Sequence, residues 1–459
     1  MSNLAIHLLY RLINEHSYFS CNRIFLFQKD LPPISVEQLK TIDQYDIVGF
    51  SISYELDYFN VVEILKRSSI PIFSTERDLS HPLIIGGGIC LTYNPEPLAD
   101  IFDLILIGEA EDAIKEILDR YVEVLDFVKT REDLLLSFRD IEGIYIPRFY
   151  RDGEPIIGDL PVRIKRRVFK DFDRETAYSC IKTDGTVFGD MFLLEIERGC
   201  PMRCKFCVAG NIYLPCRIKS LDTVKRIVSQ YKGIYSKVGL MGPLVGGIPY
   251  IKDLLKWLIA EGFKVSVSSL RVSTLDGEFL ELLKLAGETA ITIAPEFIDE
   301  GIRASLGKKE SNEKILEVLE TSFKMGFKRV KLYMIFGYDD YQRELKSLEY
   351  FKKSIDKLLR DYKAYISFNF QPLIPKPFTP LESYNIPSRK ELEEQKRKII
   401  DILRNERFRV NIASIRESLL EIAISRGDRR ILPLILNREI KKIMDNAFVP
   451  FRPIGFIQI

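Results

Sequence analysis

The sequence predicts an α/β protein that contains two parallel sheets. In the first 125 residues, short apolar stretches such as "YDIVGFSI" and "PLIIGGGI" alternate with helical patterns. From Met191 onward the same alternation recurs six times in succession. Apolar strands separated by helices are typical of parallel sheets that are covered on both faces. Six consecutive β/α units therefore predict a second, barrel-like sheet.

In the N-terminal part, strands are expected at 45–52 and 82–89, and "DLILIGEAEDAIKEIL" predicts a third strand that leads into a helix. A helix is expected from Leu56 to Lys66, between the first two strands. Loops at the carboxyl ends of parallel strands are where ligands bind. Ser51, Ser53 and Gly86 to Gly88 are therefore candidate ligand-facing positions, although the glycines fit tight turns equally well.

The second region is more regular. Its expected strands are 192–197, 237–242, 264–269, 290–295, 329–337 and 365–373, and its expected helices are 220–232, 250–262, 275–287, 311–326, 340–360 and 389–405. Between the two regions, a hairpin is predicted across Asp152 and Gly153. The predicted domains are thus residues 1–125, a linker subdomain at 126–190, a core at 191–410 and an extension at 411–459.

The net charge of the chain excludes few classes of partner. Lys and Arg number 67 against 65 Asp and Glu, so the net charge of +2 neither predicts nor excludes a nucleic-acid partner. The basic run Arg163 to Lys170 fits a solvated face better than a phosphate-binding patch. No apolar run is long enough to span a bilayer, and the first residues lack a signal-peptide pattern. We therefore expect a cytoplasmic protein without a membrane partner, in which the seven cysteines stay reduced.

Catalysis by a Ser-His-Asp or Cys-His arrangement is not expected in most of the chain. The histidines are His7, His16 and His81, all in the first fifth of the sequence. No P-loop motif occurs either. The cysteines therefore remain as the leading candidates for catalytic or metal-binding residues.

Three cysteines lie within eight residues, in "RGCPMRCKFCVAG": Cys200, Cys204 and Cys207. Thiolates bind iron-sulfur clusters, zinc or copper(I). A cubane cluster usually has one cysteine per iron, so three cysteines would leave one iron open to an external ligand such as an α-amino acid. A structural zinc site needs four closed ligands, and Cys216 is the nearest candidate for a fourth. Both alternatives stay open at this point.

The stretch "ERGCPMRCKFC", which has an aromatic residue before the third cysteine and begins a six-fold β/α array, resembles the signature of the radical S-adenosylmethionine (SAM) superfamily. The resemblance implies a [4Fe-4S] cluster held by Cys200, Cys204 and Cys207. SAM would chelate the open iron and be cleaved reductively to a 5′-deoxyadenosyl radical that attacks a substrate. An electron donor such as flavodoxin or ferredoxin is implied as a partner.

The resemblance also implies residues around SAM, by their position in the array. They are Phe206 beside the adenine, Gly242 and Pro243 near the methionyl amine, Ser269 and Arg271 at the carboxylate, Glu296 at the ribose, and Gly337 at the adenine. The loop "LMGPLVGG" lacks the acidic residue that the family often has there. Arg271 and Glu296 also fit structural ion pairs, and Gly337 also fits a plain turn.

The N-terminal region resembles B12-binding domains in "GFSISYEL" and "IIGGG", but the D-x-H-x-x-G segment that supplies a histidine to cobalt is absent. Together with "NPEPLAD" (94–100), "IPKPFTP" and "SRGDRR" (425–430), it resembles a family of radical SAM proteins with a B12-binding-like domain. The implied fold is an N-terminal Rossmann-like, B12-binding-like sheet plus a (β/α)6 partial TIM barrel. In that family a strand precedes "MSNL", so we expect either an earlier start or an incomplete first sheet.

Three alternative functions stay open beside a radical SAM enzyme with an unidentified substrate. A cobalamin-dependent methyltransferase would bind cobalamin in the first domain. A methylthiotransferase, acting on RNA or protein, would need three more cysteines, of which only Cys90 lies in a comparable loop, while Cys21 and Cys180 do not. A non-catalytic iron-sulfur or zinc protein is the third.

Several residues are expected to line the mouth of the barrel, where a substrate would enter. They are Tyr213, Cys216, Tyr333 and the loop Gln371 to Pro380. Cys216 could take part in radical chemistry, although a buried, apolar role fits a cysteine better. Proline-rich loops also simply end strands.

Overall fold

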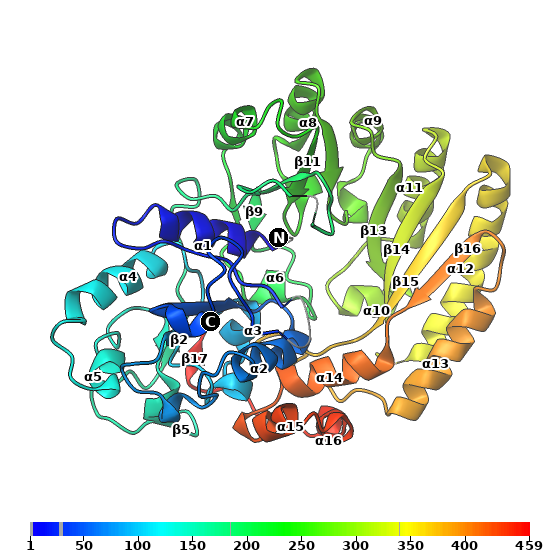
Figure 1. The fold of residues 1–459 in the computed structure, drawn as a ribbon. Coiled ribbons are helices and arrows are strands. Elements are labelled where there is room, and N and C mark those ends of the chain that lie inside the picture. The colour runs from blue at the N-terminus through cyan, green and yellow to red at the C-terminus, as the bar shows by residue number, and fades with distance from the viewer. Residues whose placement is uncertain (1–2, 27–30, 184, 339) are drawn as a thin grey trace. The chain divides into compact units, whose positions relative to one another are not determined.

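The computed structural model describes residues 3–26, 31–183, 185–338 and 340–459 (Figure 1). It divides into two compact units. The N-terminal unit consists of Ala5–Asp171, Lys376–Phe378 and Leu419–Ile459, and the barrel unit consists mainly of Phe172–Pro375 and Thr379–Ser418. The strand expected before "MSNL" concerns Met1, Ser2 and residues before them, which lie outside the described residues.

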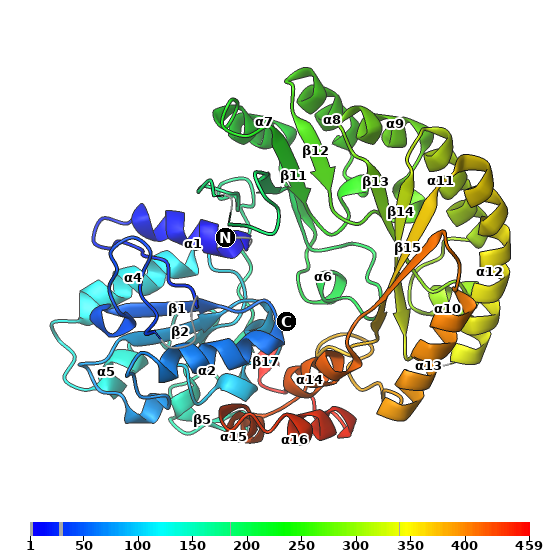
Figure 2. The same ribbon diagram turned by 45° about the vertical axis from the view of Figure 1, so that its right-hand side comes forward.

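The N-terminal unit has a four-stranded sheet in the order β1-β2-β3-β4. Strands β1, β2 and β3 are parallel, as predicted, and β4 runs antiparallel to β3. Helices α1 and α4 lie on one face of this sheet and α2 on the other (Figure 2). The bounds are β1 Ile47–Ser51, β2 Leu83–Gly87, β3 Leu104–Leu106, β4 Ile144–Tyr145, α1 Leu4–Asn14, α2 Tyr58–Lys66, α3 Ile89–Tyr93, α4 Ala113–Val124 and α5 Arg131–Leu136.

The region predicted as a linker and the C-terminal extension differ from expectation. The hairpin at Asp152 and Gly153 is confirmed, with β5 (Tyr150–Arg151) paired to β6 (Glu154–Pro155). However, β4 extends the first sheet, and β7 (Ile164–Lys165) pairs with β17 (Ile457–Gln458). Residues 126–171 and 419–459 therefore belong to the N-terminal unit. Strands of two residues carry no periodicity, so the sequence could not indicate these pairings.

The basic residues of the run at 163–170 are mostly exposed, as expected for a solvated face, and part of the run is ion-paired. Lys165 forms an ion pair with Glu142 at 2.7 Å, and Arg167 donates to Glu116 at 2.7 Å. Arg166 between them is 7% exposed. Carboxylates thus already neutralise two of the cations that a phosphate would have to use.

Two motifs that are more than 300 residues apart in the sequence meet in the N-terminal unit. The side chain of Asn94, in "NPEPLAD", donates hydrogen bonds to the carbonyl oxygens of Ser425 and Gly427, in "SRGDRR", at 3.0 and 2.8 Å. In return, Arg429 donates to Glu96 at 3.0 Å and to Asp100 at 2.9 Å. The two motifs therefore hold the C-terminal helices to the N-terminal sheet.

The barrel unit has a parallel sheet built from two parts. The order β12-β11-β8 is joined to β13-β14-β15-β16 by a parallel bridge between Leu270 and Ile293. All six predicted strands are present, and a seventh, β16, pairs with the sixth across the predicted domain boundary at 410. The bounds are β8 Phe192–Glu195, β11 Lys237–Met241, β12 Lys264–Val267, β13 Ala290–Glu296, β14 Arg329–Phe336, β15 Tyr365–Pro372 and β16 Phe408–Ile412.

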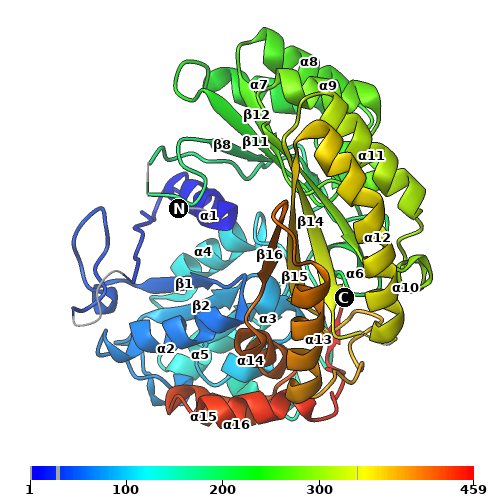
Figure 3. The same ribbon diagram turned by 90° about the vertical axis from the view of Figure 1, so that its right-hand side faces the viewer.

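Helices cover the convex face of this sheet (Figure 3). They are α7 Leu221–Gln230, α8 Ile251–Ala260, α9 Gly277–Leu285, α11 Asn312–Lys324, α12 Tyr341–Tyr362 and α13 Arg389–Ile402, all at the predicted places. Shorter or later elements are β9 Glu197–Arg198, β10 Arg217–Ile218, α6 Val208–Asn211, α10 Glu300–Ser305, α14 Ile415–Ser425, α15 Leu432–Leu436 and α16 Ile440–Asp445.

The two faces of the barrel sheet differ in burial. On β14, Val330, Leu332 and Met334 point toward the helices and are at most 1% exposed. The alternate residues Lys331 and Tyr333 lie on the concave face, where Tyr333 is 43% exposed. The concave face is therefore not filled by apolar side chains as a closed barrel core would be.

Among the helices of the described ranges, none combines the length and the apolar character that a membrane-spanning segment requires.

Candidate functional site

The cysteine loop follows β8 and the short strand β9, and it ends at helix α6, which lies on the concave side of the barrel sheet (Figure 2). Cys207 caps the N-terminus of α6. The backbone N–H of Cys200 donates to the carbonyl of Ala209 at 3.0 Å, and that of Cys207 donates to Cys204 at 3.0 Å. The Asn211 side chain donates to the carbonyls of Cys204 and Cys207, at 3.0 and 2.7 Å. These bonds fix the loop from within.

Two glycines let the loop fold tightly. Gly199 has a φ of +78°, and a Cβ atom there would lie 2.5 Å from the carbonyl oxygen of Tyr213. At Gly210, a Cβ atom would lie 2.9 Å from the Cα of Arg203. Neither position can carry a side chain, because its Cβ atom would overlap backbone atoms.

Two of the three cysteines are buried, and Cys207 is half-buried. Cys200 and Cys204 are 8% and 7% exposed. Burial raises the pKa of Cys200 to about 11 and also raises the pKa of Cys207. These groups therefore stay protonated at neutral pH unless a bound metal compensates the thiolate charge.

The donor set fits an iron-sulfur cluster. Within the ranges that the structure describes, no three His, Cys, Asp or Glu side chains are arranged around one position for a metal ion. That arrangement concerns ligands of a single ion, whereas a cubane binds each thiolate through a different iron. Cys216, the expected fourth zinc ligand, instead donates from its Sγ to a Glu197 oxygen 3.8 Å away.

Arg271, the expected carboxylate ligand of SAM, is part of an ion pair in the structure. Its Nε lies 2.5 Å from Oε1 of Glu310, and its Nη2 lies 3.3 Å from the carbonyl oxygen of Gly307. Its Nη1 lies 3.6 Å from the sulfur of Cys204. The sequence pattern placed Arg271 at the site but did not indicate Glu310, which lies 39 residues later.

Glu296, the expected ribose ligand, is also in an ion pair. Its carboxylate lies 2.7 Å from Nζ of Lys308, which also donates to the carbonyl of Ala294 at 2.5 Å. Glu296 has a φ of +69°, in the left-handed region. Burial raises the pKa of Glu296 despite the lysine. The structure therefore brings Glu296 and Arg271 to the site, each with a charged partner of its own.

The loop after β11 approaches a carboxylate that the sequence analysis missed. A Cβ atom at Gly242 would lie 2.8 Å from the Cβ of Glu197. One Glu197 oxygen accepts a hydrogen bond from the backbone N–H of Leu244 at 2.6 Å, and burial raises the pKa of Glu197. Ser268, the residue before Ser269, donates to the Gly242 carbonyl at 3.0 Å. Glu197, three positions before Cys200, thus lies beside the loop "LMGPLVGG", which has no acidic residue of its own.

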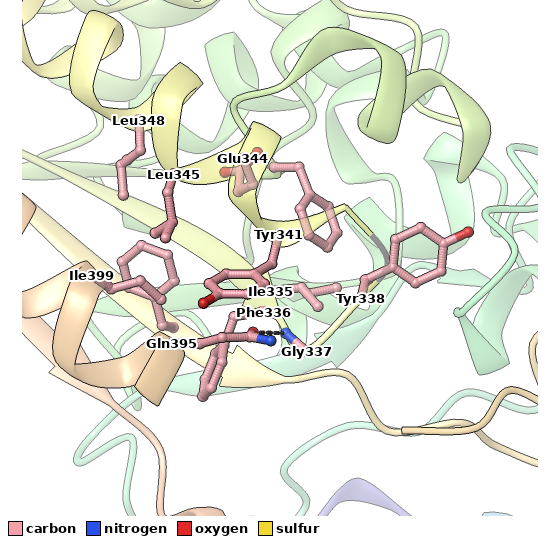
Figure 4. Close-up of a pocket in the computed structure, with 12 residues that line it drawn as sticks. Ile335, Phe336, Gly337, Tyr338, Tyr341, Glu344, Leu345, Leu348, Gln395 and Ile399 are labelled. Carbon is pink, nitrogen blue, oxygen red and sulfur yellow. Dashed lines mark hydrogen bonds between the residues drawn. The ribbon is translucent and has the colours of Figure 1, made fainter. Parts of the chain in front are cut away.

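Phe206 packs at the edge of an apolar cluster formed by Phe297, Ile302, Leu306, Leu373 and Leu381. Near this cluster is a small pocket, which Gly337 lines (Figure 4). The N–H of Gly337 donates to Oε1 of Gln395 at 3.0 Å. Gly337 has a φ of +81°, and a Cβ atom there would lie 2.8 Å from Leu392. The positive φ and the close contact with Leu392 thus explain a glycine at this turn.

The residues expected at the barrel mouth fall in different places. Tyr333 is exposed on the concave face, and its strand neighbour Asn369 interacts with Asn411 at 2.9 Å. From the loop 371–380, Lys376–Phe378 belong to the N-terminal unit. There the Lys376 ammonium lies 2.8 Å from Glu421 and also contacts Glu55.

The carboxyl ends of the N-terminal strands are closely packed by the chain itself. A Cβ atom at Gly88, where φ is +100°, would lie 2.4 Å from the carbonyl oxygen of Ile52. Glu55 is 1% exposed and accepts a hydrogen bond from the hydroxyl of Tyr93. Tyr93 also contacts Cys90, which is 1% exposed. The candidate positions Ser51, Ser53 and Gly86 to Gly88 thus adjoin a buried polar cluster.

No histidine follows these strands at their carboxyl ends. His81 precedes β2 and lies 2.8 Å from Asp78, and His16 lies 3.0 Å from Asp119. His7 is buried on α1. An axial histidine for cobalt is therefore not placed at this edge.

Comparison with known proteins finds two regions of the chain that match radical SAM proteins. The sequence profile of the radical SAM superfamily matches residues 194–351, and the profile of the N-terminal region of radical SAM proteins matches residues 5–147. An uncharacterized protein of Methanocaldococcus jannaschii is 29% identical over 438 residues, which are 94% of this chain and 86% of that protein.

Solved structures that are similar over most of the chain include a methyltransferase. It is the radical SAM methyltransferase TsrM from Kitasatospora setae, determined with cobalamin and a [4Fe-4S] cluster bound. The identity is 14%, the TM-score is 0.54, and 88% of each chain is covered. At this identity the likeness concerns the fold.

Proposed function

We propose that Cys200, Cys204 and Cys207 hold the [4Fe-4S] cluster at which this chain, which carries the N-terminal and core domains of radical SAM enzymes, cleaves SAM. The observation that carries the proposal is the loop itself. It presents three free cysteines, shaped by two glycines, beyond the first strand of a parallel barrel sheet. Active sites of β/α barrels lie at the carboxyl ends of the strands.

When bound, the cluster would supply the electron that cleaves SAM to a 5′-deoxyadenosyl radical. The chain holds the thiol-bearing loop through Asn211 and shields it by burial. Phe206 and its apolar cluster exclude water beside the third cysteine. The protein's part is therefore positioning and exclusion of solvent.

We assign the SAM contacts to the loops that surround the cysteines. Gly242 and Pro243 would approach the methionyl group, with Glu197 as the nearby carboxylate. Ser269 would face the methionyl carboxylate, Glu296 the ribose, and Gly337 the adenine. Glu296 suits the ribose because its carboxylate is already held by Lys308.

The substrate would bind on the concave face of the barrel sheet. Tyr333, Asn369 and Asn411 lie side by side on adjacent strands and carry hydroxyl and amide groups. Such groups recognise polar substrates by hydrogen bonds. The exposed Tyr333 hydroxyl is a candidate contact with the substrate.

Anaerobic reconstitution with iron and sulfide tests the proposal. Wild type should bind about four irons per chain and, with dithionite and SAM, form 5′-deoxyadenosine. Cys204→Ala should lose both, whereas Cys180→Ala, which changes a cysteine outside the loop, should keep both. An intact cluster in wild type that yields no 5′-deoxyadenosine would refute the enzymatic proposal.

A second candidate is a cobalamin-dependent radical SAM methyltransferase. The fold likeness to TsrM over 88% of the chain favours it. The residues at the N-terminal sheet edge do not supply an axial histidine, so cobalamin would bind there without a histidine ligand to cobalt. The measurement that tests this candidate is the corrin bound per chain after reconstitution with hydroxocobalamin. About one corrin per chain would support methyl transfer, and the absence of bound corrin would rule this candidate out.

The enzyme needs a reductant. We propose a flavodoxin or ferredoxin as the donor and the cytoplasm as the compartment, because thiol ligands persist where disulfides do not form.

A further inference from the structure

Arg271 reaches the sulfur of the middle cysteine. Its Nη1 lies 3.6 Å from Sγ of Cys204, a distance at which an N–H group donates a hydrogen bond to sulfur. Arg271 follows β12, whereas Cys204 lies 67 residues earlier, in the loop after β8. The contact therefore depends on the barrel fold.

The guanidinium is held in this position by two other partners. Nε lies 2.5 Å and Nη2 lies 3.4 Å from the two oxygens of Glu310, and Nη2 also donates to the Gly307 carbonyl at 3.3 Å. Glu310 accepts a further hydrogen bond from Ser273 at 3.0 Å. The side chains of Arg271 and Glu310 are 9% and 7% exposed. A planar guanidinium with two of its nitrogens engaged has little freedom to turn.

The same segment that binds Arg271 also packs against Cys204. The N–H of Lys205 donates to the carbonyl of Leu306 at 3.0 Å. At Gly307, where φ is +93°, a Cβ atom would lie 3.4 Å from the Cα of Cys204. Arg271 and Cys204 are thus joined to one short segment, 306–310, which keeps their separation constant.

We propose that Arg271 is a positioning residue that donates a hydrogen bond to the sulfur of Cys204 and raises the reduction potential of the cluster. This inference rests on the proposed cluster site. One-electron reduction adds negative charge to the cluster and its thiolates. A hydrogen-bond donor that carries positive charge stabilises the reduced form more than the oxidised form. Reduction by an external donor thereby becomes easier.

This role differs from binding the carboxylate of SAM. Glu310 already occupies the Nε and Nη2 edge of the guanidinium, so a substrate carboxylate that binds at this edge would have to displace a buried one. Breaking a buried ion pair is costly. The proposed hydrogen bond to Cys204 uses Nη1, which Glu310 does not engage.

The test measures the cluster's midpoint potential in reconstituted protein without SAM, by redox titration with electron paramagnetic resonance of the reduced cluster. Variants are Arg271→Met, which removes the donor, and Arg271→Lys, which keeps the charge. Arg343→Met is the matched control, because Arg343 forms an ion pair with Asp299 at 2.7 Å in the same unit. Iron content is matched before titration.

We expect Arg271→Met to need a more negative potential, with at least a tenfold lower ratio of reduced to oxidised cluster at the same applied potential. Tenfold corresponds to about 59 mV for one electron. Arg271→Lys should fall between wild type and Arg271→Met, and the Arg343→Met potential should equal that of wild type. If Arg271→Met does not keep its iron, the test is the midpoint potential of Arg271→Lys, which should be more negative than that of wild type.

A wild-type potential in the Arg271 variants with full iron content would overturn the inference, even if SAM binds more weakly. Failure of wild type to assemble a cluster would refute the proposed function instead. The two failures are therefore distinguishable.

Discussion

Gly199 is the residue on which closure of the cysteine loop depends. It combines a left-handed φ of +78° with contact distances of 2.5 and 2.8 Å from a virtual Cβ to the carbonyl oxygens of Tyr213 and Pro215. Backbone oxygens cannot move away as flexible side chains can. A side chain at this position would therefore displace the segment 213–216, which precedes β10, or the loop that carries Cys200.

Gly199→Ala should lower stability and iron binding together. The left-handed conformation costs a non-glycine residue about 1–3 kcal/mol, and the clash adds to it. Gly233→Ala is the control, because Gly233 has a φ of +81° and nothing within 4 Å of a virtual Cβ. Thermal unfolding and iron content per chain are the measurements. Equal effects of the two substitutions would show that backbone conformation alone matters at Gly199.

At the scale of elements, Glu344 connects helix α12 to the segment after β13. Its carboxylate accepts hydrogen bonds from the N–H groups of Ile298 and Asp299, both at 2.8 Å. Burial outweighs these bonds and raises the pKa of Glu344 to about 7. The protonated form is therefore favoured in the folded state.

This raised pKa predicts a loss of stability with rising pH. The folded chain binds the Glu344 proton more tightly than the unfolded chain. The contribution of this proton to the free energy of unfolding is therefore full below the ordinary pKa of a glutamate, and it is lost as the pH rises through about 7. The loss is on the order of 3 kcal/mol. Urea unfolding under reducing conditions measures the free energy of unfolding at pH 5 and at pH 8. Between these pH values, the decrease should be larger for wild type than for Glu344→Gln by about this amount.

The control for this measurement is Glu349→Gln, which changes an exposed carboxylate on the same helix. It should keep the pH dependence of wild type. An identical pH dependence in wild type and Glu344→Gln would contradict the assignment to Glu344.

At the scale of the whole chain, the N-terminal unit is assembled from three separate stretches of sequence. Lys376, from the connection between β15 and α13, contacts Glu55, from the loop after β1, and Glu421, on α14. Burial lowers the pKa of Lys376, but the two carboxylates outweigh it and the net shift is upward. The side chain of Glu55 is 2% exposed. Two buried carboxylates thus depend on one cation.

Lys376→Met should destabilise the protein by about 3–5 kcal/mol, because it leaves buried carboxylates without a counter-charge. Adding Glu421→Gln to Lys376→Met should recover part of this loss. Lys442→Met, which removes an exposed ion pair with Glu439 in the same unit, should change stability by less than about 1 kcal/mol. Chemical denaturation of the three variants measures these differences. A loss no larger in Lys376→Met than in Lys442→Met would contradict the prediction.

The sequence by itself determined the parallel β/α arrangement, the six barrel strands and the position of the cysteine loop. These features depend on apolar runs and spacings within a few tens of residues, and such local patterns are visible in one sequence. The cysteine spacing was equally informative, because three thiols in one short loop have few chemical uses.

The tertiary structure alone decided the long-range pairings. Arg271 with Glu310, Glu296 with Lys308, Asn94 with Ser425 and Gly427, and β7 with β17 all join residues that are separated in the chain. Burial creates these partnerships, since a polar group that leaves water must find a partner wherever the fold brings one. Their identity depends on packing in three dimensions, which no local pattern of residues records.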